Sequence, residues 1–311
     1  MNDLPHGIRR LTFPLPLGIR HVHCYLLPGP DGWTLVDTGL GLPDAAERWE
    51  PVLAELDAPV VRIVVTHFHP DHAGGGEDAQ ALTGARVYQG ARDYEQCEGV
   101  WGRKNWSERL ADYLRGHGLP EPLAEELRQE ARIFAPFIRF ARDPERLQEG
   151  DEVGGWQVLE LPGHADGHIG LLRNGVLVAG DHLLQKITPT IGLYPDSRPE
   201  PLGDYLASLE RTVELAPSLA LPGHNEVVSD PAGRAREILE HHRRRLDETV
   251  AALASEPRSA YEVSLSLFGA DLDASGRRFA LAETLAHLER LVQEGRAARK
   301  GADSAFSYTA R

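Results

Sequence analysis

Short apolar runs separated by glycine and proline open the chain and predict a sheet. The runs cover residues 8–11, 22–27 and 33–36, and Pro30-Asp31-Gly32 stands just before the last of them. Runs this short, with turn residues between them, are typical of antiparallel strands joined by tight turns. Apolar positions at near-helical spacing in 43–56 then predict a helix that covers the sheet.

The order then changes to strands that alternate with helices. The run Val60-Val61-Arg62-Ile63-Val64-Val65 predicts a buried strand, residues 76–83 predict a helix, and 85–88 predict a second strand. Strand–helix–strand order is typical of βαβ units. We therefore expect an α/β protein whose first sheet is mixed and has helices outside.

Residues 93–142 differ from the strand-rich sequence around them. Trp101, Trp106 and Tyr113 come first, and a stripe of apolar residues at steps of three or four then predicts an amphipathic helix. The stripe consists of Leu123, Leu127, Ala131, Phe134 and Ile138. Two interpretations stay open: a helical pair on the flank of the sheet, or a lid whose aromatic side chains line a substrate cleft.

Strand patterns return in the second half of the chain. The predicted strands are 153–161, 169–172, 176–179 and 219–221. Asn174-Gly175 stands between the second and third and is a strong hairpin signal, and a helix is predicted for 205–216. Three further strand ends in this half present histidine or aspartate beside glycine.

The composition shifts after Asp230-Pro231, which we interpret as a domain boundary. The elements predicted beyond it are helices at 234–254, 261–268 and 278–294, and extended pieces at 297–299 and 306–308 around a turn at 301–303. That order resembles a winged helix. We therefore expect a large domain over 1–230 and a helix plus a winged-helix-like domain over 231–311.

Composition narrows the classes of partner. A chain of 311 residues with 41% hydrophobic content can bury one large core and a smaller one. A formal net charge of -14 argues against binding nucleic acid or an anionic membrane by a basic surface, and favours a small-molecule partner. Cys24 and Cys97 cannot supply a disulfide framework. With no secretion signal or membrane-length apolar run, we expect a cytoplasmic protein.

Four potential metal ligands follow the predicted strand 60–65: His67, His69, Asp71 and His72. Pro70 and the glycines at 74–76 favour a loop, and a loop can turn alternate side chains to opposite sides. His67 and His69 can then bind one metal ion while Asp71 and His72 bind another. Imidazole and carboxylate ligands suit zinc, and also iron or manganese.

Completing two such sites needs more histidine and a bridging carboxylate. His164, Asp181 and His224 each stand at a predicted strand end beside glycine. Asp37 closes another strand, where it either orients a neighbouring loop or simply belongs to a turn.

These motifs together resemble the metallo-β-lactamase-fold superfamily. The matching elements are Asp37-Thr38-Gly39, the His-x-His-x-Asp-His run at 67–72, the Pro-Gly-His-x-x-Gly-His run at 162–168, Gly180-Asp181 and Pro222-Gly223-His224. The resemblance implies an αβ/βα sandwich with metals at one edge of the facing sheets. The ligands it implies are His67, His69 and His164 for one metal, Asp71, His72 and His224 for the other, and Asp181 as the bridge. His168 is left to packing or to the support of a ligand.

The C-terminal part is similar to the winged-helix extension of one branch of that superfamily. This branch includes glyoxalase II-like and endoribonuclease-like proteins. Winged helices serve in packing and dimerisation as well as in nucleic-acid contact, so a homodimer and a nucleic-acid partner both stay open.

We expect a dinuclear metal-dependent hydrolase in which a metal-bridging hydroxide attacks a small carboxylic ester, thioester or lactone. Asp71 is the candidate catalytic residue, orienting the hydroxide and passing its proton to the leaving group. The alternative is a metal-dependent endoribonuclease or phosphodiesterase that uses the winged helix and Arg243-Arg244-Arg245 to contact nucleic acid. A third hypothesis, a regulator whose metal domain senses a ligand, is weakened by the full ligand set.

Candidate substrate contacts come from sequence position. Trp101 and Trp106 belong to the possible lid, and His182 and Tyr194 follow Asp181. Tyr194 could hydrogen-bond a substrate oxyanion, as a tyrosine does in lactonases that the chain resembles. His21 and His23 share one face of a strand, and the sequence does not decide between the cleft and solvent.

Overall fold

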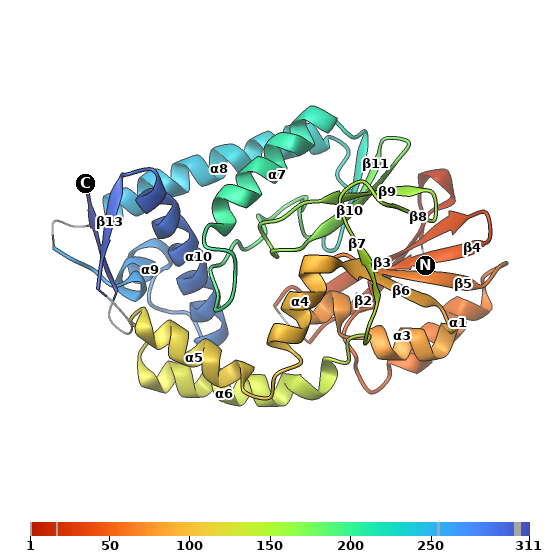
Figure 1. The fold of residues 1–311 in the computed structure, drawn as a ribbon, viewed down its shortest axis with the longest axis horizontal. Coiled ribbons are helices and arrows are strands. Elements are labelled where there is room, and N and C mark those ends of the chain that lie inside the picture. The colour runs from red at the N-terminus through yellow and green to blue at the C-terminus, as the bar shows by residue number, and fades with distance from the viewer. Residues whose placement is uncertain (1, 17, 254–255, 302–305) are drawn as a thin grey trace.

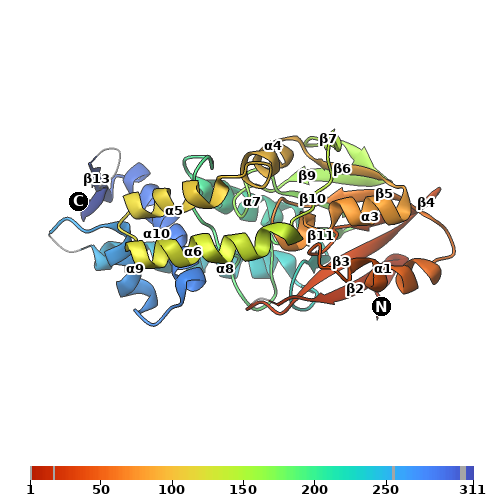
Figure 2. The same cartoon turned by 90° about the horizontal axis from the view of Figure 1, so that it is seen from below.

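Two sheets stack face to face at one end of the molecule, and the C-terminal helices gather at the other end (Figure 1). The computed structural model describes residues 2–16, 18–253, 256–301 and 306–311. Figure 2, seen from below, shows α5 (Trp106–Gly116) and α6 (Glu121–Phe134) running from the helical end toward the sheets.

The first sheet has seven strands in the order β1-β2-β3-β4-β5-β6-β7. Their bounds are Asn2–Asp3, Arg9–Pro14, His21–Gly29, Gly32–Val36, Val60–Val65, Arg86–Gly90 and Glu145–Leu147. Pairing is antiparallel from β1 to β4 and parallel from β4 to β7. This confirms the predicted antiparallel opening and the mixed sheet.

The second sheet has five strands in the order β12-β11-β10-β9-β8. In chain order the bounds of β8 to β12 are Glu152–Val153, Trp156–Glu160, Ile169–Arg173, Val176–Gly180 and Leu219–Pro222. The β10–β11 hairpin turns at Asn174 and Gly175, whose φ angles of 50° and 77° both lie in the left-handed region that a tight hairpin turn needs. The predicted hairpin is confirmed.

Alternate side chains of β5 enter cores on both sides of the first sheet. Ile63 and Val65 pack with Trp49 of the covering helix α1 (Ala45–Ala54). Val64 packs with Trp156 of the second sheet, in the core between the sheets. A strand buried on both faces is a continuous apolar run in sequence, as β5 is. The layers therefore form the expected αβ/βα sandwich.

Helices cover the outer face of each sheet. On the first sheet these are α1, α3 (Gly76–Thr83) and α4 (Ala91–Val100), and on the second α7 (Pro201–Leu215) and α8 (Pro231–Ala252). The other regular elements are α2 (Pro70–Ala73), α9 (Ala260–Phe268), α10 (Ala274–Gln293), the paired strands β13 (Ala297–Lys300) and β14 (Ser307–Ala310), and 3-10 turns at Pro5–Gly7 and Ala135–Phe137.

Two predicted helical regions differ in detail from the structure. The 93–142 segment contains most of α4 in addition to the helical pair α5 and α6. The long helix α8 begins earlier than predicted because the Asp230 side chain accepts a 2.9 Å hydrogen bond from the N–H of Gly233 and Pro231 takes the first helical position. Ala254, the predicted end of that helix, and residues 302–303 of the predicted turn lie outside the described residues.

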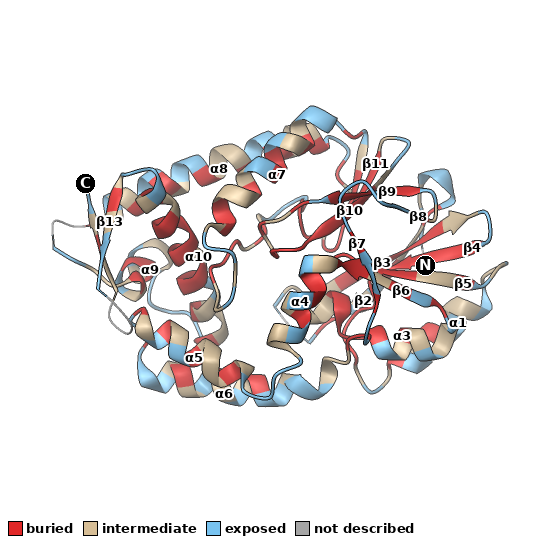
Figure 3. Cartoon of the chain, in the orientation of Figure 1, coloured by how far each residue is buried: buried red, intermediate tan, exposed pale blue. Residues whose placement is uncertain are grey.

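One hydrophobic core extends across residue 230, where we predicted a domain boundary. It joins Leu177 of β11, Leu209 of α7, Ile238 of α8, Leu285 of α10 and Tyr308 of β14. Figure 3 shows that α10 is buried along most of its length. The two-domain division and the winged helix stay predictions. No helix in the described ranges is long and apolar enough to cross a membrane.

Candidate metal centre

The histidine run, residues 67–72, begins after β5 and continues into a single helical turn. The predicted loop is wrong for its second half, because Pro70–Ala73 form α2. A proline is tolerated at the first position of a helix, where its missing N–H breaks no helical hydrogen bond. His67 and His69 therefore precede the helix, whereas Asp71 and His72 project from its turn.

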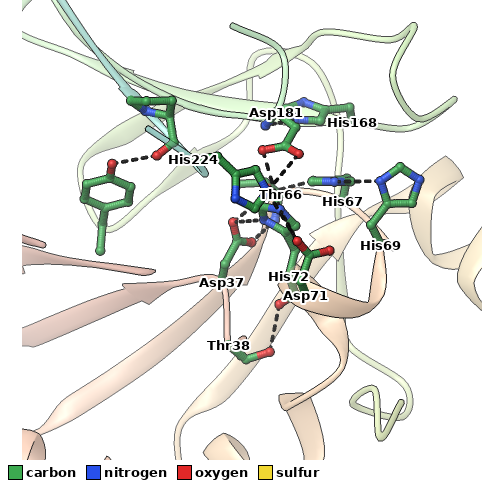
Figure 4. Close-up of polar contacts among 12 residues, drawn as sticks. Asp37, Thr38, Thr66, His67, His69, Asp71, His72, His168, Asp181 and His224 are labelled. Carbon is green, nitrogen blue, oxygen red and sulfur yellow. Dashed lines mark hydrogen bonds and ion pairs between the residues drawn. The ribbon is translucent and has the colours of Figure 1, made fainter. Parts of the chain in front are cut away.

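The other three candidates follow strand ends of the second sheet. His164 follows β9, Asp181 directly follows β11, and His224 follows β12. Because β11 and β12 are parallel, with Gly180 opposite Pro222, Asp181 and His224 leave the sheet at the same edge. Figure 4 shows both side chains facing the histidine run.

Seven side chains come together in three overlapping groups. The groups are His67, His69 and His164; His67, His72 and Asp181; and Asp71, His72 and His224, and within each the ligand atoms lie within 4.8 Å of one another. These are the seven residues that the sequence singled out. The first and third groups share no residue, so they can serve two ions, and the second group connects them.

The carboxylate of Asp181 lies between the two outer groups. Its Oδ2 is 3.6 Å from His164 Nε2 and 3.3 Å from His224 Nε2, and its Oδ1 is 3.5 Å from His72 Nε2. Asp71 Oδ2 is also 3.3 Å from the same nitrogen of His224. One carboxylate thus faces both groups, as a bridging ligand must.

Backbone acceptors fix the outer ring nitrogens of two of these histidines. Thr190 O lies 2.9 Å from His164 Nδ1, and His21 O lies 2.6 Å from His224 Nδ1. A carbonyl oxygen can only accept, so each Nδ1 carries the proton and donates it. When the ring is neutral, the Nε2 lone pair is left for the site, which is how metal-binding histidines are commonly held.

Asp37 holds the histidine run from the end of β4. Its Oδ1 accepts the N–H of Thr66 at 2.8 Å, and its Oδ2 accepts the Thr66 hydroxyl at 2.9 Å and lies 2.8 Å from His72 Nδ1. The Thr66 hydroxyl also lies 3.0 Å from His67 Nδ1. Asp37 therefore orients the neighbouring loop, which was the functional interpretation of this position.

Burial and charge divide the histidines into two kinds. Burial, with repulsion from neighbouring histidines, lowers the pKa of His67 and His69 well below 6.5, so both are neutral near pH 7. Burial also opposes charge on His224, but Asp181 and Asp71 outweigh it and raise its pKa to about 10. The centre therefore combines neutral imidazoles with carboxylates that attract positive charge.

The donor set fits divalent metal ions. His72 Nε2, His164 Nε2 and Asp181 Oδ1 are buried and have no hydrogen-bond partner among the residues that the structure describes. A buried polar group without a partner costs about 1–3 kcal/mol, and coordination to a cation would satisfy all three. Nitrogen and oxygen donors without sulfur suit zinc, iron or manganese.

Glycine lets the second sheet approach the site closely. A Cβ at Gly223 would lie 2.5 Å from Asp181 Oδ1 and 2.5 Å from His72 Cε1. Gly180 has a φ of 48°, and a Cβ there would lie 2.7 Å from His168 Nε2. That nitrogen of His168 accepts the N–H of Asp181 at 3.2 Å. His168 thus supports the backbone of a ligand.

Trp101 lies beside the histidine run, and Trp106 packs against Trp101. Trp101 Nε1 donates a 2.7 Å hydrogen bond to Phe68 O, and the two tryptophan rings meet edge to face with centroids 4.8 Å apart. Both side chains are half-buried. Trp101 thus contacts the histidine run, and the lid interpretation of 93–142 stays a prediction.

Tyr194 and His182 have different surroundings from the tryptophans. Tyr194 is half-buried beside Leu193, whose N–H donates to Ala282 O of α10 at 3.0 Å, and burial raises the pKa of the phenol. His182 is fully buried, with Nε2 2.8 Å from the Thr212 hydroxyl of α7. His182 therefore packs against α7, and its contact with substrate stays a prediction.

Asp93 and two N-terminal histidines support the centre from outside. Asp93 was not singled out from the sequence, yet its buried Oδ1 accepts the N–H of Phe68 at 3.0 Å. His23 Nε2 lies 2.7 Å from Asn225 O, and His21 Nε2 accepts the N–H of Asn225 at 3.2 Å. His21 and His23 thus face the loop that carries His224. An aspartate early in a helix is too common a pattern to have revealed Asp93.

A two-sheet α/β sandwich with histidines and aspartates in adjoining groups at its strand ends defines a metal-dependent hydrolase. The chain belongs to the metallo-beta-lactamase superfamily, whose family model matches residues 17–224. Residues 246–311 match a second model, the metallo-beta-lactamase-like C-terminal domain.

Relatives agree with this class. The crystal structure of metallo-beta-lactamase family protein TTHA1429 from Thermus thermophilus has a TM-score of 0.85, 37% identity, and coverage of 99% of each chain. The probable metallo-hydrolase YqjP of Bacillus subtilis is 29% identical over 302 residues, which are 91% of this chain and 92% of the relative. The atrochrysone carboxyl ACP thioesterase of Claviceps purpurea is 24% identical over 255 residues, 79% of this chain and 66% of the relative.

Proposed function

We propose that this chain hydrolyses a small carboxylic ester, thioester or lactone with two divalent metal ions, zinc being the first candidate. The observation that carries this proposal is the pair of ligand groups joined by Asp181. The ligands would be His67, His69 and His164 for one ion, Asp71, His72 and His224 for the other, and Asp181 for both. Iron stays a candidate because TTHA1623, with a TM-score of 0.51 and 26% identity over 70% of this chain, was crystallised in a di-iron-bound form.

When bound, divalent ions in these groups polarise an acyl carbonyl and lower the pKa of water toward neutrality. Asp71 has a pKa of about 2, because nearby histidines outweigh the effect of its burial. It is therefore ionised at neutral pH, and its Oδ2 accepts a hydrogen bond from the attacking water and orients it. The proton passes by way of Asp71 to the leaving oxygen or sulfur. Water is thereby added across the acyl bond, giving a carboxylic acid and an alcohol or thiol.

Trp101, which contacts the histidine run at Phe68, and Trp106, which packs on Trp101, would supply apolar surface for the carbon chain of an acyl substrate. A thioester leads the panel of substrates because one relative is named as an acyl carrier protein thioesterase. A small-molecule thioester is the partner class that we propose, and the net charge of -14 favours it over nucleic acid.

The nucleic-acid alternative gains no support from the arginine run on α8. Arg243 and Arg244 both pair with Glu240, and Arg245 Nη1 lies 3.1 Å from a Glu248 oxygen. Each of these guanidinium groups thus has an acidic partner on its own helix. A solvated helix face explains the run without a phosphate contact.

The test begins with elemental analysis of the purified protein and continues with ester, thioester, lactone and single-stranded RNA substrates, each with and without a chelator. We expect turnover of an acyl substrate that the chelator removes and added metal restores. Asp71→Asn should lower kcat about 100-fold or more. Asp112→Asn, on the exposed surface of α5, should leave it unchanged. Metal-loaded protein that is inactive on every acyl substrate, or that cleaves only RNA, would refute the proposal.

A further inference from the structure

The segment 183–200, between β11 and α7, has no helix or strand, and outside contacts determine its path. Within it, one backbone hydrogen bond is present, from the N–H of Ser197 to Tyr194 O at 3.2 Å. The same segment supplies Thr190 O, which accepts from His164 Nδ1. The orientation of His164 therefore depends on a segment whose conformation is fixed mainly by contacts with other parts of the chain.

Arg234, in the first turn of α8, clamps the start of this segment. Its Nε donates to Leu184 O at 2.8 Å and its Nη2 to Ile187 O at 3.0 Å. The remaining nitrogen, Nη1, donates to Glu237 at 2.9 Å. The side chain is 17% exposed. A planar guanidinium can reach two carbonyls at once in this way, whereas an ammonium presents a single point of contact.

A second anchor lies on the other side of Thr190. The N–H of Leu193 donates to Ala282 O of α10 at 3.0 Å. Pro189 stands directly before Thr190, and its ring fixes its own φ, so the chain between the two anchors has less freedom. In Figure 1 the segment passes beside α10 on its way to α7. Thr190 is thus held between anchors that both come from the region after residue 230.

We propose that Arg234 is a positioning residue for His164: it sets the path of 183–200, so that the Thr190 carbonyl holds the imidazole with Nε2 turned toward the metal centre. The C-terminal region then takes part in building one metal group rather than only packing beside it. This inference rests on the proposed role of His164 as a ligand.

Arg234→Gln should weaken the metal bound by the His67–His69–His164 group about 10-fold or more, the usual cost of losing support for a metal-binding histidine. Glutamine can reach one of the two carbonyls but not both. The metal affinity of Arg234→Lys should lie between that of the wild type and that of Arg234→Gln. Glu237→Gln is the matched control, because it removes the ion pair and leaves both carbonyl bonds of Arg234 intact.

The measurement is a competitive zinc titration against a chromophoric chelator, which yields two stepwise dissociation constants. His164→Ala should weaken one of the two constants and His224→Ala the other, which assigns each constant to a ligand group. If Arg234 acts through His164, Arg234→Gln should have no further effect on the first group in a His164→Ala background. Thermal unfolding with excess chelator reports any general loss of stability.

Unchanged constants in Arg234→Gln, or an equal weakening of both groups, would overturn the positioning role. If Arg234→Gln does not fold, the two zinc dissociation constants of Arg234→Lys are compared with those of Glu237→Gln, and the same outcomes decide. A different result, in which His164→Ala itself keeps both metals at wild-type affinity, would refute the ligand assignment in the proposed function. The Arg234 variants therefore test the positioning role, whereas His164→Ala tests the ligand assignment.

Discussion

Replacing Asp37 by asparagine should weaken metal binding at the Asp71–His72–His224 group. The amide oxygen can still accept the N–H of Thr66, but the amide nitrogen then faces His72 Nδ1, where a carboxylate oxygen lies at 2.8 Å. His72 must either lose this hydrogen bond or move its proton to Nε2. In the second case the lone pair no longer faces the site. The backbone is not the cause, because asparagine tolerates the φ of 61° found here.

The magnitude follows from the hydrogen bond that His72 Nδ1 would give up. Loss of a partner behind a metal-binding histidine costs about 10- to 100-fold in metal affinity, or roughly 1.4–2.7 kcal/mol. Stability without metal should also fall, by about 1.5–3 kcal/mol, because a hydrogen bond to a charged group is removed from a side chain that is 2% exposed.

Zinc titration against a chelator, together with urea unfolding, measures both effects. Asp31→Asn is a matched control, because Asp31 pairs with Arg62 at the surface and should change stability by less than about 0.5 kcal/mol. Wild-type affinity for both metals in Asp37→Asn would refute the reasoning. A uniform loss at both groups would mean that Asp37 supports the whole loop rather than His72.

Two further predictions concern packing at the site and the buried histidine pair. Gly223→Ala should weaken metal binding at least about tenfold, because its Cβ would lie 2.5 Å from Asp181 Oδ1, whereas Gly99→Ala meets nothing within 4 Å and should keep full metal content by elemental analysis. Burial lowers the pKa of His242 to about 2 and of His287 to about 4, from 6.5. The unfolded chain therefore binds protons first, so stability is complete above pH 6.5 and falls by about 1.4 kcal/mol per pH unit per histidine toward pH 4. His287→Gln should flatten that slope in urea unfolding, and an unchanged slope would contradict it.

The parts of the fold that the sequence predicts well are those set by local chemistry. The tight hairpin turn needs two residues in the left-handed region, and the Asn174-Gly175 pair adopts it readily, so the pair predicts the hairpin. The continuous apolar run of β5 is stable only where both faces of the strand are buried, so the run predicts a central strand. The short helix α2 was missed because four residues are too few for a helical period and Pro70 suggested a break. Proline at a first helical position is compatible with both interpretations.

The site divides in the same way. The seven candidate ligands stand at or just after strand ends, which the sequence predicts, but their grouping around two metals came from the resemblance to the superfamily, because they lie on two different sheets. His182 adjoins Asp181 in sequence but turns toward α7, because consecutive residues leaving a strand point in different directions. Asp93 and the contact between Trp101 and Phe68 depend on packing between distant segments, which no spacing pattern encodes.

The hydrophobic core that continues across residue 230 should determine how the protein unfolds. Leu285 of α10 and Leu177 of β11 belong to one cluster, so loosening the last long helix removes packing from the sheet that carries Asp181. Unfolding should then be cooperative over the sandwich and the C-terminal helices together. The two family models match on either side of residues 225–245, and the cooperative unfolding that we expect extends across that stretch.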